Sequence, residues 1–226
     1  MEVKHLAEKQ LEMARRVIVA DRFGEIRRIG GCDVSLRRSR RPSEGAATIA
    51  VFTYPAIELL EVATVRGHVE FPYVPGFLSF RELPLVAEAF ARLSEPPDAL
   101  ILDGQGLVHP RRFGLACHAG VELGLPTIGC AKSLLCGEFK PFKLRRGQQS
   151  PILLDGETVG YAVCTRDGVK PLFVSPGHRV SCQTAVEIVL TCAHRYRQPE
   201  PTRLAHIESR LAVTEGDAGN PDSDFP

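Results

Sequence analysis

A buried strand, a helix and a second buried strand follow one another between residues 98 and 132. The short apolar runs DALILDG (98–104) and PTIGCAK (126–132) are typical of buried strands. RRFGLACHAGVELG (111–124) between them has the character of a helix that Pro110 can start and Gly124 can end. This order predicts two parallel strands with a right-handed crossover. The chain is therefore expected to be an α/β protein.

Three more strands are expected before this unit, in 29–36, 46–54 and 58–69. Their short connections predict an antiparallel meander. In IGGCDVSL the alternation places Cys32, Val34 and Leu36 on one face and Asp33 and Ser35 on the other. The meander and the following parallel βαβ units together predict a mixed sheet with helices on its faces.

The other expected elements complete a single domain over residues 1–207. A first helix is expected over 3–20, with Leu11, Ala14 and Ile18 on one face. Two further helices are expected over 79–94 and 181–197, and Tyr196 lies in the helical register of the second. Two further strands are expected over 159–165 and 171–175. Residues 208–226 are acidic and rich in Gly, Asp, Pro and Ser, so they are expected to form a disordered tail.

Composition narrows the class of protein. The charged amino-terminal stretch is not a secretory signal, and no apolar run is long enough to span a bilayer, so we expect a cytoplasmic protein without a membrane segment. The seven cysteines are odd in number and lack C-x-x-C spacing, which favours small core residues over disulfides or zinc. The net charge is +1, but basic clusters at 37–41, 109–112 and 140–146 are either solvated surface or phosphate contacts.

Three acidic residues are candidates for a metal site. Asp33 lies within a strand, where a buried carboxylate needs a compensating partner. The alternative is that Asp33 lies at an edge or exposed position. Asp103 ends the strand LILDG, where ligands of α/β sheets bind, although Asp-Gly is also a common turn. Glu82 ends S-F-R-E, which matches a helix capping box, although Pro84 makes the helix start uncertain. If the three converge, their oxygen atoms suit Mg²⁺ or Mn²⁺.

Nearby residues extend the hypothesis to phosphate chemistry. Arg111 and Arg112 in HPRRFG are expected at a helix start, where an anion can dock. Lys132 ends the second parallel strand, level with Asp103, and is either a phosphate contact or exposed. His178 precedes the last expected helix; it is either structural or, near acidic residues, a metal ligand or proton carrier. The chain has neither G-x-G-x-x-G nor a Walker loop.

Several motifs together resemble the endonuclease V family of deoxyinosine-directed repair nucleases. They are GCDVSL, PYVPGFLSFRE, LDGQGLVHPRRFG, PTIGCAKSLLCG and PLFVSPGHRVS, in order across about residues 5–203. The resemblance implies a ribonuclease H-like fold and Mg²⁺-dependent DNA hydrolysis, with Mn²⁺ expected to substitute. The cut would fall at the second phosphodiester 3′ to a deaminated base, chiefly hypoxanthine, leaving a 3′-hydroxyl and a 5′-phosphate.

The resemblance also implies roles for particular residues. The catalytic set would be Asp33, Glu82, Asp103, Lys132 and His178, with the three acidic residues binding the metal. Tyr73, flanked by Pro72, Val74 and Pro75, would be a strand-separating wedge, held stiff by proline. The base pocket would include Gly76, Leu78, Gly104, Gly106 and His109, and the phosphate contacts Arg111 and Arg112. The expected partner is DNA containing deoxyinosine or another deaminated base, bound by a monomer.

Three other functions agree with parts of the sequence. An RNA-directed nuclease of the same family would cut inosine-containing RNA single strands. A non-catalytic nucleic-acid-binding protein would keep the fold but not need the intact Asp33, Glu82 and Asp103. An actin-like or sugar-kinase ATPase would use acidic residues with Mg²⁺ on a related fold, but this chain is short for two lobes.

Overall fold

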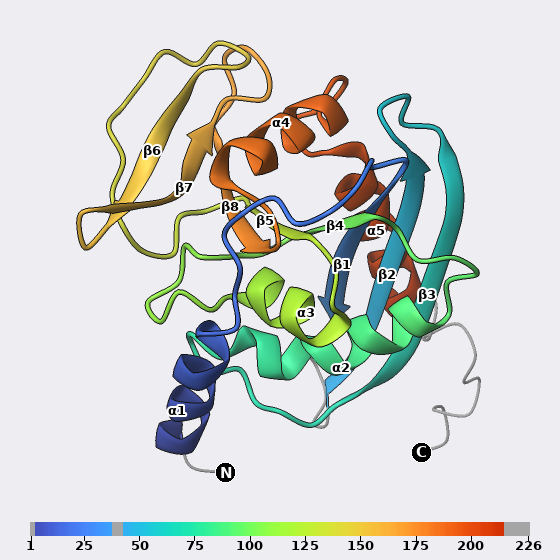
Figure 1. The fold of residues 1–226 in the computed structure, drawn as a ribbon. Coiled ribbons are helices and arrows are strands. Elements are labelled where there is room, and N and C mark those ends of the chain that lie inside the picture. The colour runs from blue at the N-terminus through green and yellow to red at the C-terminus, as the bar shows by residue number, and fades with distance from the viewer. Residues whose placement is uncertain (1–2, 38–42, 215–226) are drawn as a thin grey trace, which may run out of the picture.

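In the computed structural model, which describes residues 3–37 and 43–214, a mixed β-sheet lies between two layers of helices (Figure 1). The eight strands of these residues lie in the order β3-β2-β1-β4-β5-β8-β7-β6. Their bounds are β1 Arg28–Leu36, β2 Ser43–Thr53, β3 Leu59–Val69, β4 Ala99–Leu102, β5 Thr127–Ala131, β6 Gln149–Leu154, β7 Glu157–Val163 and β8 Leu172–His178.

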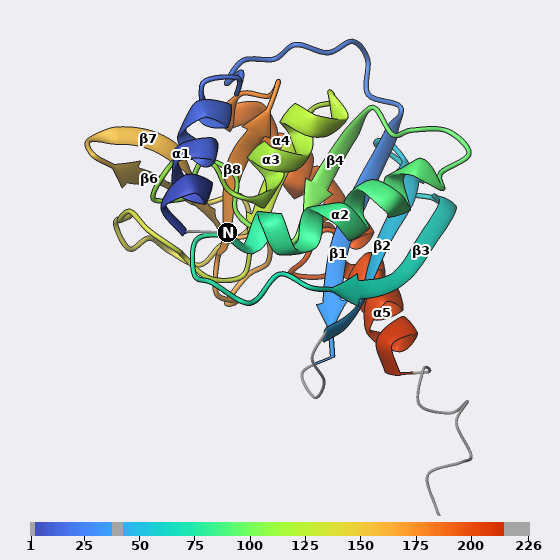
Figure 2. The same ribbon diagram turned by 90° about the horizontal axis from the view of Figure 1, so that it is seen from below.

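Five helices of the described residues cover the two faces of the sheet (Figure 2). They are α1 Val3–Ala14, α2 Leu78–Ala91, α3 Leu115–Leu123, α4 Cys182–Cys192 and α5 Glu200–Thr214. Helices α1, α2 and α3 lie on one face, and α4 and α5 on the other. Because neighbouring strand residues point to opposite faces, Leu100 packs in the core on the α2 side and Ile101 in the core on the α4 side.

The predicted meander and parallel unit are both confirmed. Strand β1 pairs antiparallel with β2, with Cys32 opposite Ile49, and β2 pairs antiparallel with β3, with Ile49 opposite Ala63. Strand β1 also pairs parallel with β4, with Cys32 opposite Leu102, and β4 pairs parallel with β5, with Leu102 opposite Gly129. The expected mixed sheet of a ribonuclease H-like fold follows from this pairing.

The rest of the sheet is antiparallel, which corrects the expectation of several parallel units. Strand β8 pairs antiparallel with both β5 and β7, and β7 pairs antiparallel with β6. The predicted strands 159–165 and 171–175 correspond to β7 and β8 with shifted bounds. Strand β6 is not predicted by the sequence pattern, because Gln149 and Pro151 interrupt its short apolar run.

Helix α1 is shorter than predicted and presents a different face. It ends at Ala14 instead of residue 20, and Leu11 and Ile18 are 52% and 39% exposed. The buried residues are Leu6, Gln10 and Met13. Their spacing is helical, but the central residue is a glutamine, so a search for apolar periodicity selects the wrong face.

Helix α2 does not use the capping box that its sequence suggests. It starts at Leu78, with Phe77 as an N-cap that makes no side-chain capping bond, and it includes Pro84. Ser79 lies in the first turn, and its hydroxyl is 3.0 Å from Nδ1 of His118 on α3. Glu82 is only 8% exposed, and its buried carboxylate does not cap the helix.

Helix α3 starts later than predicted but ends where expected. Its N-cap is Gly114, so Pro110 does not start it and Arg111 and Arg112 precede it. Gly124 is its C-cap, with a φ of 71° that favours glycine.

Helix α5 corrects the predicted tail and the end of the last helix. Residues 208–214 belong to α5, because Ala205, Ser209 and Ala212 are buried at helical spacing. The rest of the predicted tail, 215–226, lies outside the described residues. Helix α4 ends at Cys192, and Tyr196 lies beyond it, with its ring 4.2 Å from the guanidinium of Arg203.

The seven cysteines are free, and five of them are buried, as expected for core residues. Among the described residues, no helix has the length and apolar character needed to cross a membrane.

The bond between Ser79 and His118 gives a prediction about stability and pH. Burial lowers the pKa of His118 to about 4 from an ordinary value of 6.5. The folded protein therefore favours the neutral imidazole. The contribution of neutral His118 to the free energy of unfolding is fully present above pH 6.5. Between pH 6.5 and 4 this contribution should fall by about 1.4 kcal/mol per pH unit, because only the unfolded chain takes up the proton.

Urea unfolding at pH 7.5 and pH 5 measures this difference. His118→Phe removes the titrating group and should reduce the loss of stability at pH 5 relative to the original chain. Equal losses in the two proteins would show that His118 does not contribute to the acid sensitivity.

Candidate metal centre and adjoining pocket

Asp33 lies on the face of β1 opposite that of Cys32, as the strand alternation predicts, and this face is covered by α5. Its Oδ2 accepts a hydrogen bond of 2.7 Å from the hydroxyl of Ser209 and lies 3.2 Å from Nδ1 of His206. Asp33 is 9% exposed. The carboxylate is thus inside the fold and needs the polar partners that α5 supplies.

Asp103 comes directly after β4 and beside Asp33. The backbone N–H of Asp103 donates to the carbonyl of Cys32 at 3.0 Å, which continues the β1–β4 pairing. Its Oδ2 is 2.5 Å from Nζ of Lys132. Lys132 follows β5, so the prediction that it lies level with Asp103 is confirmed. The parallel pairing therefore brings two carboxylates and one ammonium group together.

Glu82 adds a third acidic side chain from α2. Burial raises its pKa to about 8, and the charges of Asp33 and Asp103 contribute to the same shift. Burial also raises the pKa of Asp103, while Lys132 acts in the opposite direction. The predicted convergence of Asp33 and Asp103 is therefore present in the fold, and the charges of both reach Glu82.

These residues fit a hard divalent cation. Ligand atoms of Asp33, Asp103 and His206 lie within 4.8 Å of one another. Buried carboxylates at this separation repel one another unless a proton or a cation compensates them. The pKa of Glu82 is raised mainly by its burial, and the charges of Asp33 and Asp103 add to the shift. Carboxylate oxygens with one imidazole are suitable ligands for Mg²⁺ or Mn²⁺.

His178 is not part of this group, which corrects its predicted role near the acidic residues. It lies opposite Thr127 at the start of β5, whereas Lys132 follows the end of that strand. The five residue steps from Thr127 to Lys132 separate the two positions by about 17 Å along the strand. Nδ1 of His178 accepts a hydrogen bond of 3.3 Å from the backbone N–H of Ile18, so it supports the segment after α1.

His206 takes the place near the acidic residues that the sequence analysis assigned to His178. It lies on α5, and Ser209 follows one turn later toward the same carboxylate. The available signal was this i, i+3 spacing beside the small buried residues Ala205 and Ala212. It is only visible once 200–214 is taken as a helix.

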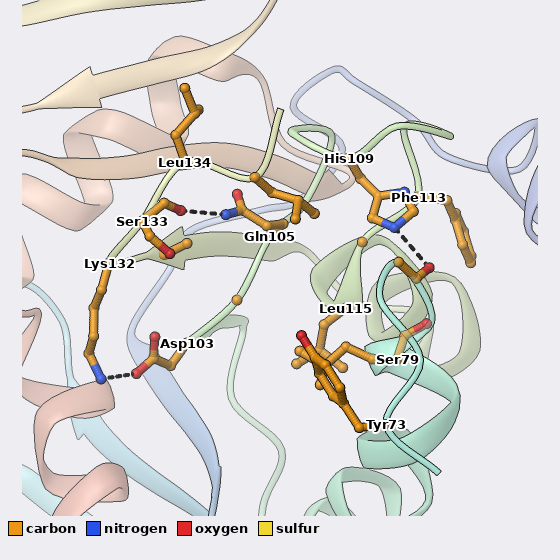
Figure 3. A pocket seen from close by; sticks show the side chains of 16 residues that line it. Tyr73, Ser79, Asp103, Gln105, His109, Phe113, Leu115, Lys132, Ser133 and Leu134 are labelled. Carbon is orange, nitrogen blue, oxygen red and sulfur yellow. Dashed lines mark hydrogen bonds and ion pairs between the residues drawn. The ribbon is translucent and has the colours of Figure 1, made fainter. Parts of the chain in front are cut away.

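A pocket of about 350 Å³ adjoins Asp103 (Figure 3). Of the predicted base-pocket residues, Gly76, Leu78, Gly104 and His109 line it. Further lining comes from residues the sequence analysis did not select, among them Gln105, Phe113, Gly114, Leu115, Leu134 and Leu135. They come from the loop after β4, the start of α3 and the segment after β5, which are brought together only by the fold.

Gly106 does not line the pocket, in contrast to the prediction. Its backbone N–H donates to the hydroxyl of Ser175 at 2.9 Å, inside the fold. A Cβ at this position would lie 2.0 Å from the carbonyl oxygen of Pro176. The glycine therefore permits close packing of the loop against β8.

Tyr73 lies at the mouth of the same pocket and is 68% exposed. Pro72 and Pro75 are also exposed, and Val74 is half-buried. The wedge prediction requires an exposed Tyr73 at the mouth of a cavity that Asp103 also lines, and the role of Tyr73 in separating strands stays a prediction. In Figure 3, Tyr73 and Asp103 both border the cavity.

The two arginines of HPRRFG have intramolecular partners. Arg112 forms ion pairs with Asp155 and Glu157, near the turn between β6 and β7. Nη2 of Arg111 donates to the carbonyl of Gly76 at 2.8 Å. Because neither arginine is at a helix start, the physical argument for an anion there is wrong, and their phosphate contacts stay a prediction.

Comparisons with known proteins show which family the chain resembles. Residues 11–207 match the family model described as Endonuclease V. Endonuclease V of Dictyoglomus turgidum is 45% identical over 212 residues, which cover 94% of this chain and 91% of the relative. The crystal structure of endonuclease V from Streptomyces avermitilis has a TM-score of 0.89 and 39% identity, and covers 96% of this chain and 95% of its own.

A second similar structure contains nucleic acid. It is endonuclease V of Ciona intestinalis in complex with a 24mer DNA containing an inosine followed by a ribo-adenosine. It is 29% identical to this chain, with a TM-score of 0.84, and the match covers 94% of this chain and 98% of that one.

The two histidines give a prediction about metal binding. His206→Ala should weaken binding of Mn²⁺ about tenfold, because an imidazole next to Asp33 is lost. His178→Asn should leave the affinity for Mn²⁺ within about twofold, because His178 lies at the other end of β5. Calorimetric titration of both variants measures the two affinities, and the opposite ranking would return the role to His178.

Proposed function

The chain belongs to the endonuclease V family, and we propose that it is a DNA repair endonuclease that recognises deaminated bases, chiefly deoxyinosine. It hydrolyses the second phosphodiester bond 3′ to the lesion and leaves a 3′-hydroxyl and a 5′-phosphate. The observation that carries the proposal is that Asp103 belongs both to the acidic group and to the wall of a pocket for one base. The inosine-containing DNA bound by the Ciona intestinalis relative supports the choice of substrate.

The proposed cofactor is Mg²⁺, with Mn²⁺ as a substitute. Asp33, Asp103 and Glu82 would hold the cation, together with His206. When bound, the cation would supply a water of lowered pKa and neutralise charge on the phosphate. Lys132 keeps a positive charge next to Asp103, at the side of the pocket where the phosphodiester would lie. Ser209 and His206 keep the Asp33 carboxylate oriented through their hydrogen bonds.

The pocket can accept an everted base and distinguish its deaminated form. Its volume is within the usual range for small ligands, about 300–1,000 Å³. Helices α2 and α3 begin at its wall, and their N-caps Phe77 and Gly114 make no side-chain capping bond. Backbone N–H groups at a helix start favour acceptor groups, and deamination replaces an amino donor on the base by a carbonyl acceptor.

The wedge completes the recognition step. The exposed ring of Tyr73 would fill the gap that the everted base leaves in the duplex. Eversion requires less free energy at a weakened inosine pair than at a normal pair, which contributes to selectivity. We assign the reaction to a monomer, because one chain holds all the proposed site residues, and we keep the cytoplasm as its proposed location.

Cleavage of a labelled duplex with one deoxyinosine tests the function. The original chain should nick it at one position with Mg²⁺ and not with EDTA, and the product ends identify the bond. Asp33→Ala or Asp103→Ala should reduce the rate by more than about 100-fold, because the cation loses a ligand. Binding of the duplex should largely survive, because phosphate contacts elsewhere dominate affinity.

Two further outcomes separate this proposal from its rivals. A matched RNA oligonucleotide with one inosine, cut faster than the DNA, would make the chain an RNA-directed nuclease. An Asp33→Ala or Asp103→Ala variant that still nicks inosine DNA at the original rate would contradict the assignment of the metal site.

A further inference from the structure

The carbonyl group of Gly76 accepts hydrogen bonds from three different side chains. Nε2 of Gln10 lies 3.1 Å from this oxygen, Nη2 of Arg111 2.8 Å, and Nε2 of His109 3.1 Å. A backbone carbonyl has two lone pairs, so three donors saturate it. Gly76 lies three residues after Tyr73 and directly before the N-cap of α2. The segment that carries the exposed tyrosine is therefore held at its carboxyl end.

Gln10 makes the most distant of these contacts in the sequence. It is 1% exposed, on the buried face of α1, and 66 residues separate it from Gly76. Its Oε1 accepts a short hydrogen bond from Nε of Arg111, and its Nε2 also lies 3.5 Å from the carbonyl of Phe113. Both ends of the buried amide are thus used, one on Gly76 and the other on the arginine that also binds Gly76.

His109 acts as a neutral donor in this arrangement. Its Nδ1 accepts from the backbone N–H of Arg111 at 3.2 Å, so its Nε2 carries the hydrogen that is donated to Gly76. Burial lowers the pKa of His109 to about 4, so this tautomeric arrangement persists at neutral pH. The three donors therefore remain in place under ordinary conditions.

The backbone at Gly76 has little freedom to move. Its φ is +79°, and a Cβ there would lie 2.9 Å from Nη2 of Arg111. The guanidinium carbon of Arg111 is 4.4 Å from the ring centroid of Phe77, so the same side chain also covers the next residue. By contrast, the side chain of Tyr73 is mostly exposed. The direction of Tyr73 must then be set mainly through its backbone.

We propose that Gln10 is a positioning residue for the wedge, which it holds in place through the carbonyl of Gly76. This inference rests on the proposed function, because it assumes that Tyr73 separates strands. It gives the amino-terminal helix α1 a part in recognition, although α1 provides no residue of the pocket wall.

The proposal distinguishes two kinds of substrate. A base in a duplex must be everted against pairing and stacking, so a wedge of fixed direction matters there. A base in a single strand does not need strand separation. Loss of the Gln10 contact should then affect the duplex reaction much more than the single-strand reaction, whereas a general loss of folded protein affects both equally.

Gln10→Leu is the test variant, because leucine keeps a buried apolar volume and removes both hydrogen-bonding groups. Its kcat/KM should fall about tenfold or more on a duplex with one deoxyinosine, as expected for a misdirected contact. On the single-stranded oligonucleotide of the same sequence it should stay within about twofold. Leu6→Ala, at another buried position of α1, is the matched control and should change both rates alike.

A second measurement does not depend on activity. The chain contains no tryptophan, so Tyr73→Trp introduces a single indole at the wedge position. Its fluorescence anisotropy in the free protein should fall when Gln10→Leu is added, because the segment becomes more mobile. Leu6→Ala in the same background should leave the anisotropy unchanged.

The outcomes separate this inference from the proposed function. Equal losses of kcat/KM on the duplex and on the single strand, or an unchanged anisotropy, would overturn the positioning role of Gln10. If the original chain cuts neither inosine substrate, the proposed function fails, and the anisotropy then decides alone whether Gln10 restrains the segment of Tyr73.

Discussion

The parallel pairing of β1 with β4 is the constraint on which the site depends. It places Cys32 opposite Leu102, so the residues that follow them, Asp33 and Asp103, lie side by side where β4 ends. The hydrogen bond from the N–H of Asp103 to the carbonyl of Cys32 extends the pairing to these two residues. Two buried carboxylates are unfavourable side by side, and the surrounding groups make the arrangement possible.

The compensating groups come from α5 on one face of the sheet and from the end of β5. Lys132 reaches Asp103 from the end of β5, and α5 supplies a hydroxyl and an imidazole to Asp33. Glu82 comes from α2 on the opposite face, and burial and the two aspartates raise its pKa to about 8. The same helix starts at the pocket, so α2 joins the acidic group to base recognition. The wedge is attached to this frame through Gly76, where α1 and the loop before α3 meet it.

Local sequence patterns were reliable where the chemistry is carried by strands. Strand alternation separated the two faces of β1, and the apolar run before Asp103 identified the end of β4. Patterns failed where a polar or small residue is buried. Gln10 on α1 and Ser209 on α5 belong to buried faces, so apolar periodicity misplaced the first face and missed the second helix. His178 was assigned to the wrong end of the sheet. Strand β8 runs antiparallel to β5, which places His178 at the start of β5, and a local sequence pattern does not give the relative direction of two strands.

The sequence by itself determined the mixed sheet, the convergence of Asp33 within its first strand with Asp103 after its first parallel strand, and the resemblance that named the family. These features follow from short-range periodicity and from motifs that are contiguous in the chain. Only the tertiary structure decided that His206 rather than His178 approaches the acidic group, that Gly106 packs against β8, and that Gln10 holds the loop of Tyr73. Each of these contacts joins segments distant in sequence, and each depends on packing geometry that no local pattern encodes.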